Sequence, residues 1–183
     1  IQMDQIKSAP KATGILLFLL LLNILNMVDR TLITSFGSVI IKDLNLSDSQ
    51  FGLLTGPIFV FFYSIMGLFM GALADRVHRP RLIAAGLLLW SALTAVSGMA
   101  KNFVQIGVTR LFIGVGESAM TPSAISMISD LFPKARKGTA TGIYYLGVAL
   151  GAGGSFIVAG ILGPMIGWRN CFFLLGGIGV VLT

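Results

Sequence analysis

The 183-residue chain has few of the residues from which catalytic and metal sites are built. It contains one cysteine, Cys171, which excludes an intrachain disulfide, and one histidine, His78. The sequence shows no cluster of His, Cys and Asp with metal-ligand spacing, no nucleotide-binding loop and no nucleophile beside a base. We therefore expect a protein that is not an enzyme and that has no catalytic site, no metal site and no cofactor.

Charge is also scarce. Charged residues make up 11% of the chain and hydrophobic residues 55%, and the mean hydropathy is +0.90. This composition excludes an ordinary water-soluble domain and is typical of a membrane protein. A spanning helix needs about 20 mostly apolar residues. Six stretches meet that requirement, at about residues 14–41, 51–74, 82–100, 103–131, 138–165 and 167–183.

We expect these stretches to be helices, because backbone in lipid must satisfy its own hydrogen bonds and no strand-length alternation indicates a barrel. The predicted fold class is an all-α membrane protein, with residues 1–13 as a cytoplasmic segment and residues 14–183 as a six-helix bundle. The first stretch is too long for the apolar region of a signal peptide and lacks a small-residue cleavage pattern. It is therefore expected to remain as a membrane helix.

The basic residues predict the orientation of this bundle. With a cytoplasmic amino terminus, eight of them lie inside, namely Lys7, Lys11, Arg76, Arg79, Arg81, Lys134, Arg136 and Lys137. Only Lys42, Lys101 and Arg169 lie outside. This bias agrees with the positive-inside rule. The net charge of +6 is then explained by topology and by inner-leaflet phosphates, so we expect membrane lipids and no nucleic acid as partners.

A basic hairpin separates the second and third stretches. It contains Gly71, Asp75, Arg76, Arg79 and Arg81. The pattern resembles the loop between the second and third helices of major facilitator superfamily transporters, G-x-x-x-D-R-x-G-R-x-R/K, with His78 at the usual glycine. The resemblance implies a twelve-helix fold made of two six-helix halves, of which this chain would be the amino-terminal one. We expect the full-length protein to be a monomer.

The same resemblance implies a conformational latch. In the superfamily such a loop forms a charge network that holds the two halves in the outward-open state. Here its members would be Asp75, Arg79 and Asp130, the last of these at the cytoplasmic end of the fourth stretch. The alternative is that these charges reflect only positive-inside topology and helix capping.

Four charged residues lie within the apolar stretches, where an ionised group costs about 2.5 to 3.5 kcal/mol on insertion scales. They are Asp29 and Arg30 in the first stretch and Arg110 and Glu117 in the fourth. At 1.5 Å per helical residue, Asp29 and Arg110 come to compatible depths, while Glu117 lies deeper toward the cytoplasm. We therefore expect Asp29 to meet Arg110.

Such a pair could couple transport to protons. A buried carboxylate stays charged beside an arginine and takes up a proton when the arginine moves away. The alternative is a static pair that only fixes helix packing. Because adjacent helix positions point about 100° apart, Asp29 and Arg30 are poor partners for each other.

Two further motifs narrow the resemblance. Residues 26–30 (NMVDR) resemble the N-x-x-D-R element of Spinster-type transporters, and residues 110–122 (RLFIGVGESAMTP) resemble their R-x-x-x-G-x-G-E-A-x-x-P run, with Ser118 at the alanine position. The chain is thus similar to Spinster-like proteins, as a bacterial member in the inner membrane. The resemblance implies a proton switch on Asp29 and Arg110, and amphipathic lipids such as lysophospholipids or sphingosine phosphates as substrates.

Aromatic and small residues complete the expected site. An apolar cavity with a few charges suits an amphiphile with a charged head. We expect substrate binding by Asn26, Arg30, Tyr63, Glu117 and Tyr145. In the fifth stretch, the small residues Gly147, Gly151 and Ser155 favour close helix packing. The alternative is a seam along which the helices move.

The sequence thus predicts a proton-coupled secondary transporter of an amphipathic lipid that works by alternating access. Two alternatives remain. One is a carrier of organic acids or drugs on the same scaffold, for which the substrate would be an organic anion. The other is a lipid sensor that does not transport. A sensor has less need for a titratable acid opposite an arginine, which favours the transporter.

Overall fold

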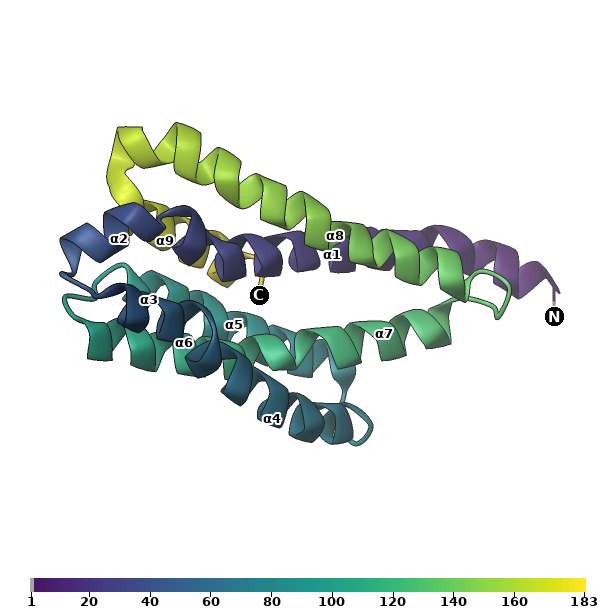
Figure 1. Ribbon diagram of the computed structural model, residues 1–183. Helices are drawn as coiled ribbons and strands as arrows, with labels where there is room; N and C mark the ends of the chain where they lie inside the picture. The colour runs from purple at the N-terminus through teal and green to yellow at the C-terminus, as the bar shows by residue number, and fades with distance from the viewer. Residues whose placement is uncertain (1) are drawn as a thin grey trace.

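The computed structural model describes residues 2–183, and their side chains from residue 10 onward. The predicted inner-side residue Lys7 therefore lies outside the described side chains. The chain is helical throughout, and no strand occurs among residues 2–183 (Figure 1). The helices are α1 (Gln2–Ser35), α2 (Gly37–Asp43), α3 (Asp48–Thr55), α4 (Pro57–Ala74), α5 (Arg79–Ser97), α6 (Phe103–Ser118), α7 (Met120–Leu131), α8 (Lys137–Ile157), the π-helix η1 (Val158–Leu162) and α9 (Gly163–Val181).

Five helical runs among the described residues are long and apolar enough to cross a membrane. They are Pro10–Ser35, Asp48–Ala74, Arg79–Ser97, Phe103–Leu131 and Lys137–Val181. The last run has 45 residues, more than one crossing requires. It folds at Gly167, whose φ of 81° lies in the left-handed region that glycine adopts readily. In Figure 1, the yellow α9 turns back here beside the body of the bundle. This kink falls at the first residue of the predicted stretch 167–183 and so at the predicted boundary with stretch 138–165.

The second and fourth runs are interrupted near prolines. Pro57 is at the start of α4, directly after Gly56, where the chain leaves α3. Pro122 lies in the first turn of α7. Its ring clashes with the carbonyl of the residue four positions earlier, Ser118, and it has no N–H to donate to that carbonyl. Ser118 is the residue at which α6 ends. The first predicted stretch, residues 14–41, is broken at Phe36, where α1 ends and α2 follows. The described residues before residue 14 are helical as part of α1 rather than separate from it.

The helices pack in a defined set of neighbours. The helix α1 lies along α8, α5 lies between α6 and α9, and α4 packs on α6 (Figure 1). The predicted small-residue packing of the fifth stretch is confirmed. A Cβ at Gly147 would lie 2.8 Å from Asn23 Nδ2, and one at Gly151 only 2.5 Å from the Ile24 carbonyl oxygen. Ser155 Oγ lies 3.0 Å from Ser35 Oγ.

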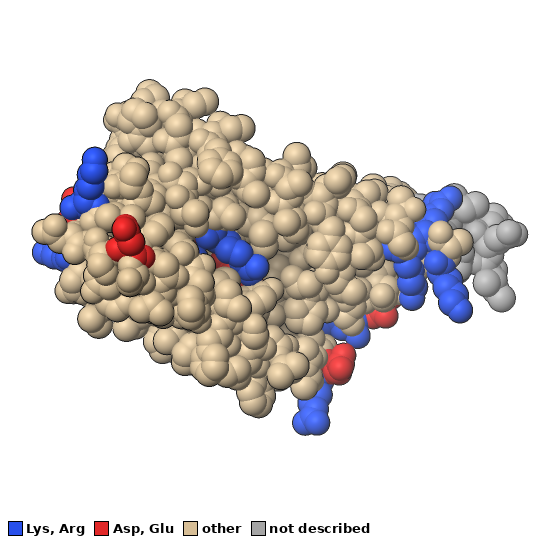
Figure 2. Space-filling model, in the orientation of Figure 1, with Lys and Arg blue, Asp and Glu red and all other residues tan. Residues whose placement is uncertain are grey.

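The surface agrees with a bundle surrounded by lipid. Large apolar side chains such as Leu68 and Phe69 are well exposed on the helices. Figure 2 shows charged atoms gathered at the two ends of the bundle, with basic atoms dominant at the end that holds the amino terminus and the α4–α5 and α7–α8 loops. Basic and acidic atoms also show in the middle of this face, within the otherwise uncharged surface.

Candidate functional site: a buried charge cluster with an ion pair at each end of the bundle

The four charged residues expected inside the membrane lie together where α1 faces α6. Asp29, Arg110 and Glu117 are almost completely buried, with 2%, 2% and 1% of their surfaces exposed. Arg30 differs, because 25% of its side chain is exposed. Two acids and two bases cancel, which makes burial of the group tolerable only while its members remain together. Arg30 is the member that a solute could reach.

Arg30 pairs with Glu117. Its Nε donates a hydrogen bond to Glu117 Oε2 at 3.0 Å, and its Nη2 also lies 3.0 Å from that oxygen. The guanidinium is 4.3 Å from the centre of the Tyr63 ring and 4.9 Å from that of Phe59. Both rings belong to α4 and attract the cation through their π faces. The exposed cation is thus held between one carboxylate and two aromatic rings.

Arg110 does not pair with Asp29, contrary to the expected contact. Its Nη2 instead donates to the backbone carbonyl of Arg30 at 3.2 Å, and its guanidinium lies 4.9 Å from the Phe59 ring centre. Among residues 10–183, no carboxylate lies within 4.0 Å of its nitrogens. Asp29 nevertheless remains within electrostatic range of Arg110. The arginine therefore holds α1 through its backbone rather than through the acid.

Asp29 faces α5. Its Oδ2 accepts a long hydrogen bond of 3.5 Å from Thr94 Oγ1, and the Trp90 side chain lies within interaction range of the carboxyl. Neither residue was predicted from the sequence. The signal that could have found them is the spacing of Trp90, Thr94 and Ser97, which places polar groups three and four residues apart on an apolar helix. The adjacent Arg30 points to α6, as a step of about 100° requires.

The predicted substrate residues fall into two groups. Asn26 is buried near Glu117, and Tyr63 stacks on Arg30, so both belong to the cluster. Tyr145 is 47% exposed, and its ring lies edge-on to that of Tyr144, with 5.3 Å between the ring centres. The neighbouring Tyr144 is fully buried, interacts with Thr121 and lies within electrostatic range of Arg30. Tyr144 is therefore the α8 tyrosine at the site. The sequence alone could not show which of the two adjacent tyrosines is buried.

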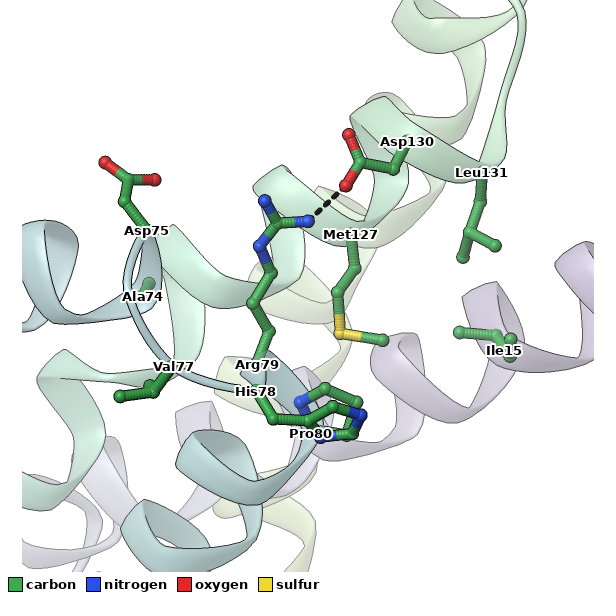
Figure 3. A pocket seen from close by; sticks show the side chains of 10 residues that line it. All are labelled: Ile15, Ala74, Asp75, Val77, His78, Arg79, Pro80, Met127, Asp130 and Leu131. Atoms are coloured by element: carbon green, nitrogen blue, oxygen red, sulfur yellow. Dashed lines mark hydrogen bonds and ion pairs between the residues drawn. The ribbon is translucent and has the colours of Figure 1, made fainter.

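At the end of the bundle that holds the α4–α5 loop, Arg79 Nη1 donates to Asp130 Oδ2 and forms an ion pair (Figure 3). Asp75, the third predicted latch residue, points away from this pair on the other side of the loop. Of the other latch residues, Gly71 has open space around it, and Arg76 and Arg81 are exposed. A cavity of about 370 Å³ lies beside the pair, bordered by α1, the loop and α7. The expected trio is thus a pair in this structure.

A second ion pair, which was not predicted from the sequence, lies at the opposite end of the bundle from the Arg79–Asp130 pair. Arg169 Nη2 is 2.8 Å from Asp43 Oδ2, and Trp168 Nε1 donates to the same oxygen at 3.1 Å. Arg169 Nη1 also donates to the carbonyls of Gly98 and Ala100 at 3.0 and 2.6 Å. One guanidinium therefore joins the end of α2, the turn after α5 and the kinked start of α9.

A comparison with protein families identifies the scaffold. The sequence profile of the Major Facilitator Superfamily matches residues 19–183. The chain belongs to this superfamily. Within it, the chain is Spinster-like: its curated relatives include Spinster homologues of Arabidopsis thaliana and Homo sapiens. A crystal structure of a bacterial homologue of the human lysosomal transporter Spinster, inward-facing and unoccupied, matches with a TM-score of 0.83 and 34% identity over 94% of this chain and 42% of that one.

Other superfamily relatives have different descriptions. An efflux pump of Mycolicibacterium smegmatis is 31% identical over 165 residues, which are 90% of this chain and 38% of the pump. A probable L-galactonate transporter of Escherichia coli is 29% identical over 171 residues, or 93% of this chain and 38% of that protein. The chain thus spans well under half the length of the curated relatives it matches. As a superfamily member with several apolar helices, it is an integral, multi-pass membrane protein.

Proposed function

We propose that this chain is part of a proton-coupled secondary transporter that moves an amphipathic lipid, a lysophospholipid or a sphingolipid-like molecule, by alternating access. The observation that carries the proposal is the neutral cluster of four buried charges, in which only Arg30 is reachable. Titratable groups buried beside opposite charges inside a membrane mark ion pathways more often than structural pairs. The similarity to Spinster homologues supports the choice of a lipid.

Asp29 is the proposed proton carrier. It is 2% exposed, and Arg110 lies within electrostatic range but outside contact. A small shift of α6 against α1 would change the distance between these opposite charges and with it the stability of the carboxylate. In this proposal, Arg110 acts on Asp29 at a distance and through its bond to the Arg30 carbonyl, and the two residues together form the proton switch.

Arg30 is the proposed anchor for the substrate. A phosphate or carboxylate headgroup would compete with Glu117 for the guanidinium, which is the shape of donor that binds such groups through two parallel hydrogen bonds. Tyr63 and Phe59 offer apolar faces beside it for the lipid stem. Asn26 and Tyr144 would border the same region, and Tyr145, being exposed, is a weaker member of it.

A carrier of organic acids is the second candidate. The L-galactonate relative is a specific observation in its favour, and a sugar acid would also present a carboxylate to Arg30. The two candidates differ in what surrounds the charge. A lipid needs apolar walls for its chain, whereas a sugar acid needs hydrogen-bond partners for its hydroxyls.

We further propose that the Arg79–Asp130 pair, with Asp75, forms the cytoplasmic latch. In this proposal, the protein spans a bacterial inner membrane and its amino terminus lies on the cytoplasmic side. The concentration of basic residues at this end of the bundle supports it. Gly71, Arg76 and Arg81 would shape the loop and contact inner-leaflet phosphates.

The test is transport in proteoliposomes at a fixed pH gradient, with a fluorescent lysophospholipid or a radiolabelled sugar acid as substrate. The full-length protein is compared with Asp29→Asn and with a control, Asp48→Asn, whose carboxylate is exposed in the first turn of α3. We expect Asp29→Asn to bind lysolipid normally and lose gradient-driven transport, while the control transports as before. Equal transport by all three, indifferent to pH, would refute proton coupling, and uptake of the sugar acid alone would refute the lipid.

A further inference from the structure

The carboxyl of Asp29 contacts α5, a helix that carries neither Arg30 nor Arg110. Thr94 Oγ1 lies 3.5 Å from Asp29 Oδ2, and Trp90 is within interaction range of the same carboxyl. Several buried polar atoms in this region have no hydrogen bond among the described residues, and Asp29 Oδ1 and Trp90 Nε1 are two of them. A carboxylate oxygen accepts and an indole N–H only donates, so these two unpaired atoms are complementary.

The helix that carries Trp90 and Thr94 is fixed on both sides. Toward α6, a Cβ at Gly86 would lie 2.7 Å from the Gly116 carbonyl oxygen, and one at Gly116 would lie 3.0 Å from Trp90 N. Toward α9, a Cβ at Gly176 would lie 2.5 Å from the Ser91 carbonyl oxygen. Backbones this close leave little room for α5 to turn or slide. Trp90 and Thr94 therefore present their polar atoms from a rigid support, with 0% and 2% of their surfaces exposed.

We infer that Trp90 and Thr94 are positioning residues for Asp29 and that they set the pH at which the proposed transporter switches. The inference rests on the proposed proton coupling. Glu117 and Arg110 of α6 act on the carboxyl electrostatically, and Arg30 is adjacent to it in α1. The other charged or titratable groups on the described elements packed around this region are Lys11 on α1, Arg79 and Arg81 at the start of α5, Asp130 on α7, Lys137 at the start of α8, Arg169 and Cys171 on α9, and the tyrosines Tyr63, Tyr144 and Tyr145.

The two residues have different roles because their side chains differ. The Thr94 hydroxyl can donate to the charged carboxylate or accept from the protonated acid, and the contact present here is the donated one, which favours the charged form. The Trp90 N–H can serve only an accepting oxygen. When the proton leaves Asp29, Oδ1 gains the capacity to accept from Trp90, and a small rotation of the carboxyl would complete that bond. Trp90 and Thr94 thus both favour release of the proton, and Thr94 can in addition hold the protonated acid in place.

The experiment measures the initial rate of gradient-driven transport against pH for full-length protein in proteoliposomes. The variants are Trp90→Phe, which removes the donor but keeps a ring, Thr94→Val, which removes the hydroxyl, and Thr94→Ser, which restores it. Ser97→Ala is the matched control, because Ser97 is buried one turn further along α5 and bonds to Thr109 instead of Asp29. We expect the midpoint of the profile to move to higher pH by about half a unit or more in Trp90→Phe and in Thr94→Val, because a donor to the carboxylate is lost. Thr94→Ser and Ser97→Ala should keep the wild-type midpoint.

An unchanged midpoint in both Trp90→Phe and Thr94→Val would overturn the inference, and so would an equal shift in Ser97→Ala. If Trp90→Phe fails to fold, the nearly isosteric Thr94→Val decides alone. A wild-type rate that does not depend on pH would overturn the proposed function and this inference together. A wild-type rate that depends on pH, together with variants that match it, would overturn only this inference.

Discussion

Replacing Gly151 by alanine should force α1 and α8 apart beside the charge cluster. A Cβ at this position would lie 2.5 Å from the Ile24 carbonyl oxygen, 2.5 Å from Met27 Cβ and 3.2 Å from Val28 N. Non-bonded carbon atoms rest about 3.5 to 4.0 Å apart, so the two backbones must separate locally by about 1 Å. The atoms that would have to move belong to backbone and to a Cβ, which cannot rotate away.

The expected cost follows from this geometry and from a control on the same helix. Inserting one carbon into a well-packed contact costs about 1 to 3 kcal/mol. At Gly153, two residues further on, a Cβ would meet nothing within 4 Å. There alanine should instead stabilise the helix by about 0.5 to 1 kcal/mol, through its smaller loss of backbone freedom. The two variants should thus differ in stability by about 1.5 to 4 kcal/mol, although their sequences differ by one methyl group moved two positions.

The assay is thermal unfolding of the detergent-solubilised full-length protein, followed by transport at a fixed pH gradient. Gly151→Ala should unfold at a lower temperature than the wild type and transport more slowly, because α1 carries Asp29 and Arg30. Gly153→Ala should equal or exceed the wild type in both. The reasoning fails if Gly151→Ala is as stable as Gly153→Ala, since the contact between α1 and α8 would then be loose.

Two other predictions concern the ion pairs at the ends of the bundle. Arg169→Lys should lower the free energy of unfolding by about 1 to 2 kcal/mol, because lysine cannot reproduce both carbonyl bonds and the contact with the Trp168 ring, whose centre lies 4.4 Å from the guanidinium. Asp43→Asn removes only a half-exposed charge and should cost less than about 1 kcal/mol. Equal losses in the two variants would contradict the role of the carbonyls. Asp130→Asn should change stability by less than about 1 kcal/mol, because its side chain is 65% exposed, yet reduce the transport rate if the pair with Arg79 is a latch. Restored transport in the charge-exchanged double variant would support the latch, and undiminished transport in Asp130→Asn would exclude it.

The helices could be predicted from the sequence because their apolar length alone requires them. Residues 103–131 and the end of the second stretch at Ala74 match the structure, since a lipid-exposed run has few other ways to satisfy its backbone. The interruptions inside these runs were not predicted. Pro57 and Pro122 carried the signal, because a proline disturbs the carbonyl four residues earlier. The break at Phe36 has no such residue and depends on packing.

The members of the charge cluster could also be predicted, but not their partners. Spacing places Arg30 on one stripe of α1 and Glu117 on one stripe of α6. Which of them meet depends on the rotation of each helix about its axis. A rotation of about 100° exchanges Asp29 for Arg30 at the interface, and depth along the helix cannot settle it. The Asp43–Arg169 pair spans more than a hundred residues and depends on the kink at Gly167. The sequence predicted a boundary between two stretches at this point, but not which side chains the turn brings together.

We propose that the coupling lies in the charge balance of the whole cluster rather than in one pair. Asp29, Arg30, Arg110 and Glu117 sum to zero charge, which is what makes their burial tolerable. An anionic headgroup at Arg30 would add a negative charge and release Glu117 from its partner. A proton taken up by either carboxyl would restore neutrality. Since Asp29 has no ion-pair partner among the described residues, it can accept that proton without breaking an ion pair. In this proposal substrate and proton are linked because neither can enter alone without leaving a buried charge uncompensated.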